Sequence, residues 1–237
     1  MRGDIIWAGV AVSNIQGLSD IIIEEPPKTN RPKRKVDRYK VPGRNGDIIV
    51  PQDAWENVPR NYPVFFHGNY DVMASLLMEW LYAPSGYQRL WDTFDSKVYR
   101  LAYVSEDTDI DNVAIYNGRC TLRFECDPRR FLLSGETAEG YSNGNPIVNP
   151  TRFLARPQIT VHGSGNGSVT IGGNTITITG IYDGMVLDCD AQDAYYGAIN
   201  CNNLVSGSFP VIPGGEQEIT ITGGITSVEV TPNWWTL

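Results

Sequence analysis

Apolar and polar residues alternate along much of the chain with the two-residue period of β-strands. Turns rich in glycine and proline separate the runs, and the 237 residues include 24 Gly and 15 Pro. In the first half the pattern predicts strands at residues 4–12, 20–25, 34–41, 47–50, 96–105 and 112–126. In the second half it predicts strands at residues 158–162, 168–171, 175–181, 185–188, 218–222 and 226–231. The chain is therefore expected to be mainly β.

One segment has the period of a helix instead. Its apolar residues recur at spacings of three and four: Met73, Leu76, Leu77, Trp80 and Leu81. Asn69 or Asp71 can cap its start, and Pro84 with Gly86 ends it. Because its apolar stripe is wide, this helix is expected to pack on a sheet.

The composition divides the chain near its middle. Residues 134–150 are rich in Gly, Pro, Ser and Asn, which is typical of a linker. We expect an N-terminal domain at residues 1–134, a linker at 135–150 and a C-terminal domain at 151–237. The repeated Ile-Thr-Ile-Thr-Gly at 176–180 and 219–223 puts Ile on one face of a strand and Thr on the other. This alternation predicts a β-sandwich in the second half. The N-terminal domain is expected to be a β-sandwich or barrel-like domain with one helix, so the whole chain is classed as a β-rich α+β protein.

The charge is distributed unevenly. The net charge of −8 and the pI near 4.8 argue against nucleic-acid binding by the whole surface. Yet residues 28–44 hold 8 of the 19 basic residues and a single acid, Asp37. From residue 145 onward there are two basic residues and seven acidic ones. Such complementary charge can bring copies of the chain together or bind a neighbouring protein.

The basic segment has the pattern of a hairpin. Asn45-Gly46 favours a tight turn because both residues tolerate positive φ, and Pro51 is expected to limit the return strand. We expect this hairpin to contact a neighbouring subunit or to line a ring, although a solvated run of charge is the alternative. The candidate interface residues are Lys33, Arg34, Lys35, Arg38, Lys40, Gly43, Arg44 and Gly46.

Motifs of catalytic and ligand-binding type fail on their context. Gly140–Gly144 matches the Gly-x-Ser-x-Gly nucleophile elbow around Ser142, but Pro146 follows where a helix is required. The acidic run 106–111 lacks the glycine and the final glutamate of a calcium loop, so we expect a solvated hairpin tip. The glycines at 163–167 do not complete a dinucleotide fingerprint, and they predict a hairpin turn. No catalysis, cofactor or metal is predicted.

The histidines and cysteines give no site either. His67 and His162 are too isolated to form a metal centre, and His67 is expected to pack or to cap the helix. No C-x-x-C pair occurs among the four cysteines, which are Cys120, Cys126, Cys189 and Cys201. The first two lie on the buried face of one strand, and whether the last two pair is left open. No run of 18 apolar residues predicts a membrane helix, and the first apolar run is interpreted as a strand rather than a signal peptide.

Two aromatic pairs, Tyr195-Tyr196 and Trp234-Trp235, allow two interpretations. Exposed aromatic rings could stack on sugars. Alternatively, one ring of each pair points into the core while the other covers an edge or joins a protein interface.

Four motifs of the first half belong together: Val41-Pro-Gly-Arg-Asn-Gly46, Glu79-Trp80-Leu81, Val98-Tyr-Arg-Leu-Ala-Tyr103 and Leu122-Arg-Phe-Glu-Cys126-Asp-Pro128. As a set they resemble the N-terminal domain of the distal tail proteins of long-tailed phages. Others look like that family's C-terminal galectin-like sandwich, namely Asp193-Ala-Tyr-Tyr-Gly197, Gly207-Ser-Phe-Pro210, Pro213-Gly-Gly215 and Gly224-Ile-Thr-Ser-Val-Glu-Val230 before Trp234-Trp235. The resemblance covers nearly the whole chain and rests on the order and spacing of the set.

The resemblance implies a structural hub in the virion tail, assembled in the host cytoplasm. In this family the N-terminal domains form a sixfold ring that continues the tail tube, and the sandwiches project outward. The implied partners are other copies of the chain, the tail tube protein, the tape measure protein, the tail-tip or tail-associated lysin protein and receptor-binding proteins. The chain has no room for an inserted carbohydrate-binding module. A lectin-like adhesin that contacts cell-wall sugar is the alternative function.

Overall fold

The structure is a computed structural model that describes residues 3–18, 21–104, 110–114 and 117–237. The chain forms two compact units, one of residues 1–130 with Leu237 and one of residues 131–236. The boundary differs from the predicted linker at 135–150. That segment contains strands β11 (Glu139–Tyr141) and β12 (Pro146–Asn149), which pair with strands near the end of the chain. Its Gly and Pro residues therefore belong to short strands and the turns beside them rather than to a free connection.

The N-terminal unit is built on one antiparallel sheet in the order β2-β1-β7-β8-β10-β6-β3, with β9 also paired to β10. Its long central pair joins β10 to β6, from Asn117 opposite His67 to Cys126 opposite Val58. The elements of the sheet and its connections are β1 (Ile5–Trp7), β2 (Val10–Ala11), η1 (Val12–Asn14), β3 (Ile22–Ile23), β6 (Val58–His67), β7 (Gln88–Asp92), η2 (Thr93–Asp95), β8 (Val98–Val104), β9 (Ile110–Ala114) and β10 (Asn117–Leu132).

The strand predicted over residues 4–12 is wrong in detail, because the segment folds back on itself as β1 and β2. Ala8 and Gly9 between them have φ values of 49° and 84°, the left-handed conformation of a tight turn. The polar Asp4, predicted to begin this strand, instead accepts hydrogen bonds from the backbone and side chain of Ser13. A single apolar run thus supplies two short antiparallel strands.

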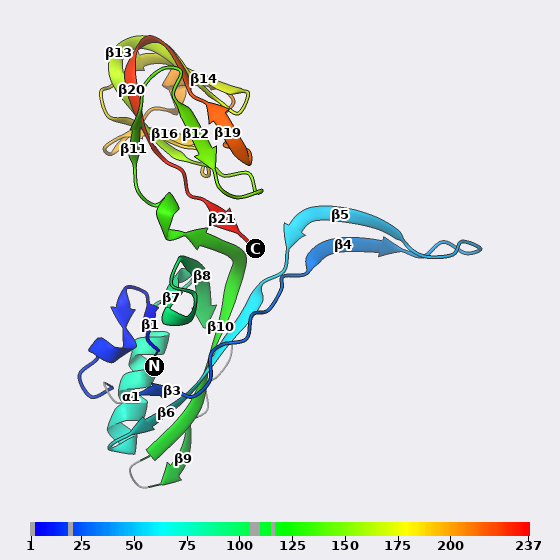
Figure 1. Cartoon of the computed structure of the whole chain (residues 1–237), viewed down its shortest axis with the longest axis vertical. Coiled ribbons are helices and arrows are strands. Elements are labelled where there is room, and N and C mark those ends of the chain that lie inside the picture. Colours follow the sequence, from blue (N-terminus) through cyan, green and yellow to red (C-terminus); the bar gives the residue numbers. More distant parts are fainter. Residues whose placement is uncertain (1–2, 19–20, 105–109, 115–116) are drawn as a thin grey trace. The chain divides into compact units, whose positions relative to one another are not determined.

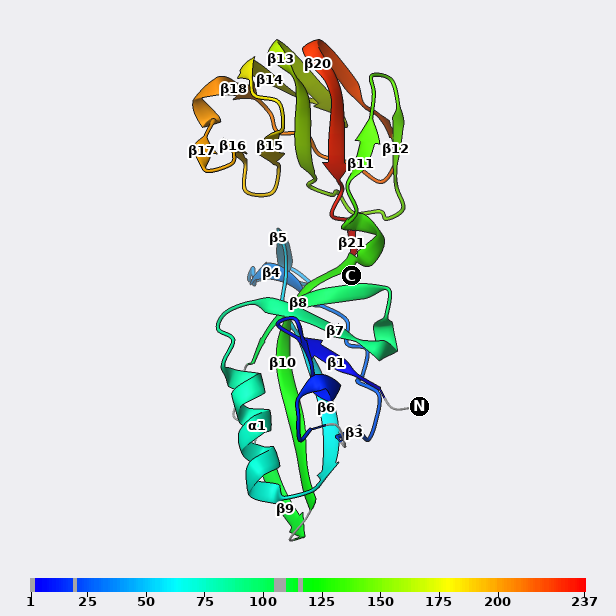
Figure 2. The ribbon, with the colours of Figure 1, turned by 90° about the vertical axis from the view of Figure 1, so that its left-hand side faces the viewer.

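The helix predicted at residues 69–84 is confirmed as α1 (Tyr70–Tyr82). The Asn69 side chain caps it by accepting a hydrogen bond from the Val72 N–H at 3.3 Å. Figure 2 shows the helix running alongside the N-terminal sheet. Its buried residues join the core formed by the sheet, and these are Met73, Leu77, Trp80 and Leu81. Burial of this stripe is what fixes the helix on the sheet.

The buried face predicted for residues 120–126 is also confirmed. Cys120, Leu122, Phe124 and Cys126 alternate with more exposed residues along β10 and lie in the core. Phe124 packs in turn against Trp7 and Tyr62, at ring-centroid distances of 4.9 and 5.9 Å. All four cysteines of the chain are buried free thiols.

The C-terminal unit is centred on the long strand β13, which pairs with β20 on one side and with β14 and β15 on the other (Figure 2). A second, two-stranded sheet joins β12 to β19. The further elements of this unit are η3 (Leu133–Gly135), β13 (Gln158–Ile171), β14 (Asn174–Ile181), β15 (Met185–Asp188), β16 (Asp193–Tyr196), β17 (Ile199–Asn200), η4 (Asn202–Leu204), β18 (Val205–Gly207), β19 (Gly215–Glu218), β20 (Thr220–Thr231) and β21 (Trp235–Thr236).

The repeated Ile-Thr motif behaves as predicted. Ile176, Ile178, Ile219 and Ile221 lie in one core, whereas the intervening threonines are not buried. The hairpin turn predicted at residues 163–167 is wrong, because these glycines lie inside β13, at irregularities in its pairing with β20. A Cβ on Gly163 would come within 2.2 Å of the Gly224 carbonyl oxygen. The glycines therefore allow two irregular backbones to approach closely.

Candidate interaction surface

The basic segment forms a two-stranded arm that is part of the N-terminal unit but not of its sheet. Among the strands that the structure describes, β4 (Arg34–Tyr39) and β5 (Ile48–Trp55) pair only with each other. Figure 1 shows the arm extending away from the sheet of its own unit. Gly43 and Gly46 at its tip both have φ of 79°, a conformation that favours glycine. The predicted hairpin is therefore confirmed, but the tight turn predicted at Asn45-Gly46 is not. Asn45 does not have positive φ, and the strands are joined by the longer segment 40–47, in which the Arg44 N–H donates to the Val41 carbonyl at 3.2 Å. Strand β5 also continues past Pro51 to Trp55.

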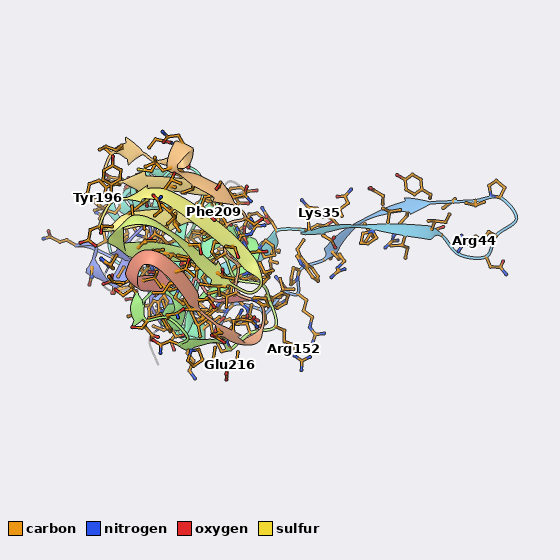
Figure 3. The ribbon with its side chains drawn as sticks, turned by 90° about the horizontal axis from the view of Figure 1, so that it is seen from above. Lys35, Arg44, Arg152, Tyr196, Phe209 and Glu216 are labelled. Carbon is orange, nitrogen blue, oxygen red and sulfur yellow. The ribbon has the colours of Figure 1, made fainter. Side chains whose placement is uncertain are left out.

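The cationic side chains of the arm are exposed to solvent. The structure places all the predicted interface residues on the arm or at its base, and Figure 3 shows Lys35 and Arg44 along its length. None of these cations makes an ion pair with another residue in the described ranges 3–18, 21–104, 110–114 and 117–237. The carboxylate of Asp37 instead accepts a hydrogen bond from Gln52 at 2.8 Å. The positive charge of the arm is thus available to a partner.

The arm also exposes large apolar side chains, which the charge pattern did not reveal. Tyr39 lies opposite Ile48, and Val50 lies opposite Asp37, so these residues share one face of the hairpin. Tyr39, Ile48 and Val50 are 56%, 37% and 45% exposed, and Ile49 on the other face is 60% exposed. The apolar run Ile48–Val50 is visible in the sequence, but assigning each residue to a face requires the strand register.

Because both its charged and its large apolar side chains are exposed, the arm has no hydrophobic core of its own. No residue of β4 or β5 is buried. A hairpin of two strands is at best marginally stable in water unless it packs on another surface. Exposed apolar residues close together on such a hairpin are typical of a protein interface. The arm therefore has the composition of a segment that is covered in an assembly.

A buried ionic cluster anchors the root of the arm. Arg60, five residues after the end of β5, binds the Asp92 carboxylate at 2.6 Å, and the two side chains are only 7% and 1% exposed. The Tyr62 hydroxyl donates to the same carboxylate at 2.7 Å. Asp92 also accepts the backbone N–H groups of Phe94 and Asp95. Burial raises the pKa of Tyr62 well above its ordinary value, because the phenolate would lose its hydration.

The cluster is fully hydrogen-bonded at Asp92, which is the condition under which a buried ion pair is tolerated. It fixes β6, the strand that follows the arm, to the end of β7. The chain therefore leaves the arm from a rigid position.

The four aromatic residues considered for sugar binding do not form one surface. Trp234 is buried in the core of the C-terminal unit. Trp235 is half-buried, stacks on Phe153 and donates its indole N–H to the Leu154 carbonyl at 3.0 Å. Tyr195 is half-buried as well, and its hydroxyl accepts a hydrogen bond from Gln158 at 3.1 Å.

Tyr196 alone of the four is exposed, at 41% (Figure 3). It stacks on Tyr182, which is 45% exposed, with ring centroids 5.4 Å apart. Sequence reasoning missed Tyr182, because the two tyrosines are 14 positions apart and only the fold brings them together. The pair forms a small exposed aromatic surface on the C-terminal unit.

The other candidate sites do not form. Ser142 lies in the turn after β11, where its N–H bonds to the Asn145 side chain, and a strand rather than a helix follows. The His162 ring lies 3.1 Å from Asp183, and the exposed His67 bonds to Asn117 rather than capping the helix. The acidic run 106–111 lies outside the residues whose side chains are described. Over the described residues, no group of His, Cys, Asp and Glu is placed to hold a metal ion, and no helix is long and apolar enough to cross a membrane.

These features define a class of fold: a mainly β chain of two units, with one helix on the N-terminal sheet and a long hairpin arm. Among solved structures, the chain is similar to the SPP1 Dit protein (gp 19.1), with a TM-score of 0.77. The similarity covers 100% of both chains at 10% sequence identity. That protein is described as a paradigm of the hub adsorption apparatus in phages that infect Gram-positive bacteria.

At this identity the likeness is one of fold. It confirms the β-rich α+β class and, at the level of fold, the resemblance to distal tail proteins. No protein-family profile and no curated protein sequence matches the chain.

Proposed function

We propose that this protein is a structural component of a phage tail, a hub that forms a hexameric ring at the distal end of the tail tube. The observation that carries the proposal is the similarity of its fold, over the full chain, to the SPP1 Dit protein at a TM-score of 0.77. The exposed arm supports it independently, because the arm carries both charge and apolar surface that no described residue of the chain covers.

The arm supplies one half of the contact that closes the ring. A ring of identical subunits needs two different complementary surfaces on each copy. Residues 28–44 hold eight basic residues and one acid, so the rest of the chain holds 11 basic and 26 acidic residues. A basic arm therefore meets a predominantly acidic surface on its neighbour. The apolar side chains Tyr39, Ile48 and Val50 add the burial that charge alone does not provide.

In this role the protein joins other tail components without doing chemistry. Its partners are the tail tube, the tape measure protein, the tail-tip or tail-associated lysin protein and receptor-binding proteins. The galectin-like C-terminal unit faces outward, the protein is located in the virion tail after assembly in the host cytoplasm, and no cofactor takes part.

The test compares matched charge reversals. Lys35→Glu with Arg38→Glu changes the arm, and Arg152→Glu with Arg156→Glu makes the same change in charge on the C-terminal unit. Light scattering and negative-stain images are expected to show rings for the natural protein and for the second variant only. Unchanged rings in the arm variant would show that the arm does not close the ring.

A second candidate function, contact with cell-wall glycans, rests on the exposed Tyr182–Tyr196 pair. Aromatic faces stack on the apolar faces of sugar rings. On a glycan array, Tyr196→Ala should abolish a signal given by the natural protein, whereas Tyr39→Ala on the arm should not. A natural protein that gives no signal removes this candidate.

A further inference from the structure

A pocket lies at the root of the arm, and all of its lining residues belong to the N-terminal unit. Its volume is about 360 Å³. One wall is the segment 28–32, which leads into the arm and which Asn30 holds against β6 by donating to the Pro59 carbonyl at 2.8 Å. The opposite wall comes from the start of β6 and the end of β10. The volume falls in the range, roughly 300–1,000 Å³, of pockets that bind ligands.

The walls of the pocket are largely apolar. Trp55, Val58 and Pro59 line it where the arm joins β6. Trp55 also packs under the Arg34 guanidinium, 5.0 Å from the ring centroid, and this contact holds the indole at the base of the arm. An apolar side chain entering the pocket would meet these surfaces and leave water.

The charged residues of the pocket are mostly cationic. Asp127, the acidic side chain among its lining residues, is already bound by Arg129 at 2.9 and 3.1 Å. Lys28 and Arg31 at the entrance are exposed, and neither forms an ion pair within the part of the chain that the structure describes. The pocket therefore attracts anions.

Arg130 is a further cation of the pocket lining. Its guanidinium lies at the long distance of 3.5 Å from Asp95, which is bound more closely by Arg100 at 2.6 Å. Another of its nitrogens donates to the main-chain oxygen of Leu237. Its Nε is buried and has no hydrogen-bond partner among the described residues. The Nε itself is closed off from the pocket, but the Arg130 side chain as a whole is 30% exposed, so its guanidinium adds positive charge that an entering carboxylate would meet.

We propose that this pocket binds a peptide segment of another protein in which a carboxylate side chain stands next to an apolar one. The apolar residue packs against Trp55 and Val58, while the carboxylate pairs with Lys28, Arg31 and Arg130. The apolar walls favour such a segment over a phosphate backbone, which offers charge but no side chain to bury. The site adds a second contact beside the arm, and it does not depend on ring formation.

The experiment measures binding of a fluorescein-labelled, capped peptide of alternating leucine and glutamate to the full-length protein by fluorescence anisotropy. The reference is the same peptide with glutamine in place of glutamate. The glutamate peptide is expected to bind at least tenfold more tightly than the glutamine peptide. In Lys28→Gln with Arg31→Gln, its Kd should rise about tenfold, because each lost charge-assisted contact weakens the complex.

Lys40→Gln with Arg44→Gln, which removes the same charge from the tip of the arm, is the matched control and should leave the Kd unchanged. Equal binding of the two peptides, equal loss in both variants, or a Kd that Lys28→Gln with Arg31→Gln does not change would overturn the proposal. Competition by a single-stranded oligonucleotide at lower concentration than the glutamate peptide would overturn it as well. Light scattering on the same samples reports ring formation separately, so failure of the pocket and failure of the hub are distinguishable.

Discussion

The arm and the β13–β14 hairpin of the C-terminal unit are both long antiparallel pairs, but only one of them contributes to a core. In β14, Ile176 and Ile178 are 1% and 0% exposed, and their strand packs within a sheet of eight strands. In the arm, Ile49 is 60% exposed, and its two strands pair with no other strand in the described part of the chain. Both hairpins have strand-forming residues and tight turns. The difference lies in what covers their apolar side chains.

This comparison teaches that the local pattern determines the strand, whereas neighbouring strands determine its burial. A hairpin that keeps apolar residues exposed in one chain gains its stability from another surface. Two kinds of measurement follow from it. Substitutions in the C-terminal hairpin should affect folding of the single chain, and substitutions in the arm should affect assembly.

The largest effect is expected where the arm is anchored. Asp92→Ala leaves the Arg60 guanidinium buried without its counter-ion, and this should lower the free energy of unfolding by about 3–5 kcal/mol. Urea denaturation of the two proteins measures the loss. Asp71→Ala, which removes an exposed carboxylate from the first turn of α1, should change it by less than about 0.5 kcal/mol. Similar losses of unfolding free energy in the two variants would contradict the conclusion that the Arg60–Asp92 pair anchors the root of the arm.

The next prediction tests the comparison between the two hairpins directly. Ile178→Ala deletes a fully buried side chain of β14 and should cost about 2–5 kcal/mol. Ile49→Ala on the arm should cost less than about 0.5 kcal/mol when measured on dissociated chains. If Ile49→Ala destabilised single chains as much as Ile178→Ala, the arm would have to be covered within its own chain.

A smaller effect is expected in the reactivity of the buried thiols, which reports on the cores of the two units. Burial raises the pKa of Cys126 and of Cys189 to about 12. At pH 8 both groups are therefore protonated in the folded chain, and they should react with a thiol reagent much more slowly than after unfolding in urea. Rapid reaction of the native protein, followed by absorbance, would show that one of these cores is open.

The same shift gives a dependence of stability on pH. The folded pKa values lie above the ordinary value of about 8.5 for an unfolded cysteine. The stabilising contribution is therefore complete below pH 8.5 and is lost as the pH rises toward 12. Urea midpoints should fall over this range, and a midpoint that rose with pH would contradict the assignment.

Much of the fold could be predicted from periodicity. The helix at Tyr70–Tyr82, the buried face of β10 and the Ile-Thr strands each have a signal within one short segment. The turn at Ala8-Gly9 was not predicted because alanine rarely adopts the left-handed conformation that it has there. The irregular strand at residues 163–167 was not predicted because glycines are as typical of a turn as of an irregularity within a strand. Strands β11 and β12, at residues 139–149, were not predicted because the turns beside them have the composition of a linker.

The candidate surface could be predicted in part. The charge and the turn of the arm are local properties, and they place all eight proposed residues in one hairpin or at its base. The apolar face, the Arg60–Asp92 cluster and the Tyr182–Tyr196 pair depend on contacts between residues far apart in sequence or on strand register. Contacts of this kind cannot be inferred from the pattern of residues within one short segment.

The central claim, that exposed arms join copies of this chain into a ring, is tested most directly by the mass of the purified particle at micromolar concentration. Light scattering should give six times the 26.3 kDa of one chain for the natural protein. It should give the mass of one chain when Tyr39, Ile48 and Val50 are all replaced by serine. A natural protein with the mass of one chain, or a sixfold particle that survives loss of the apolar face, would contradict the account.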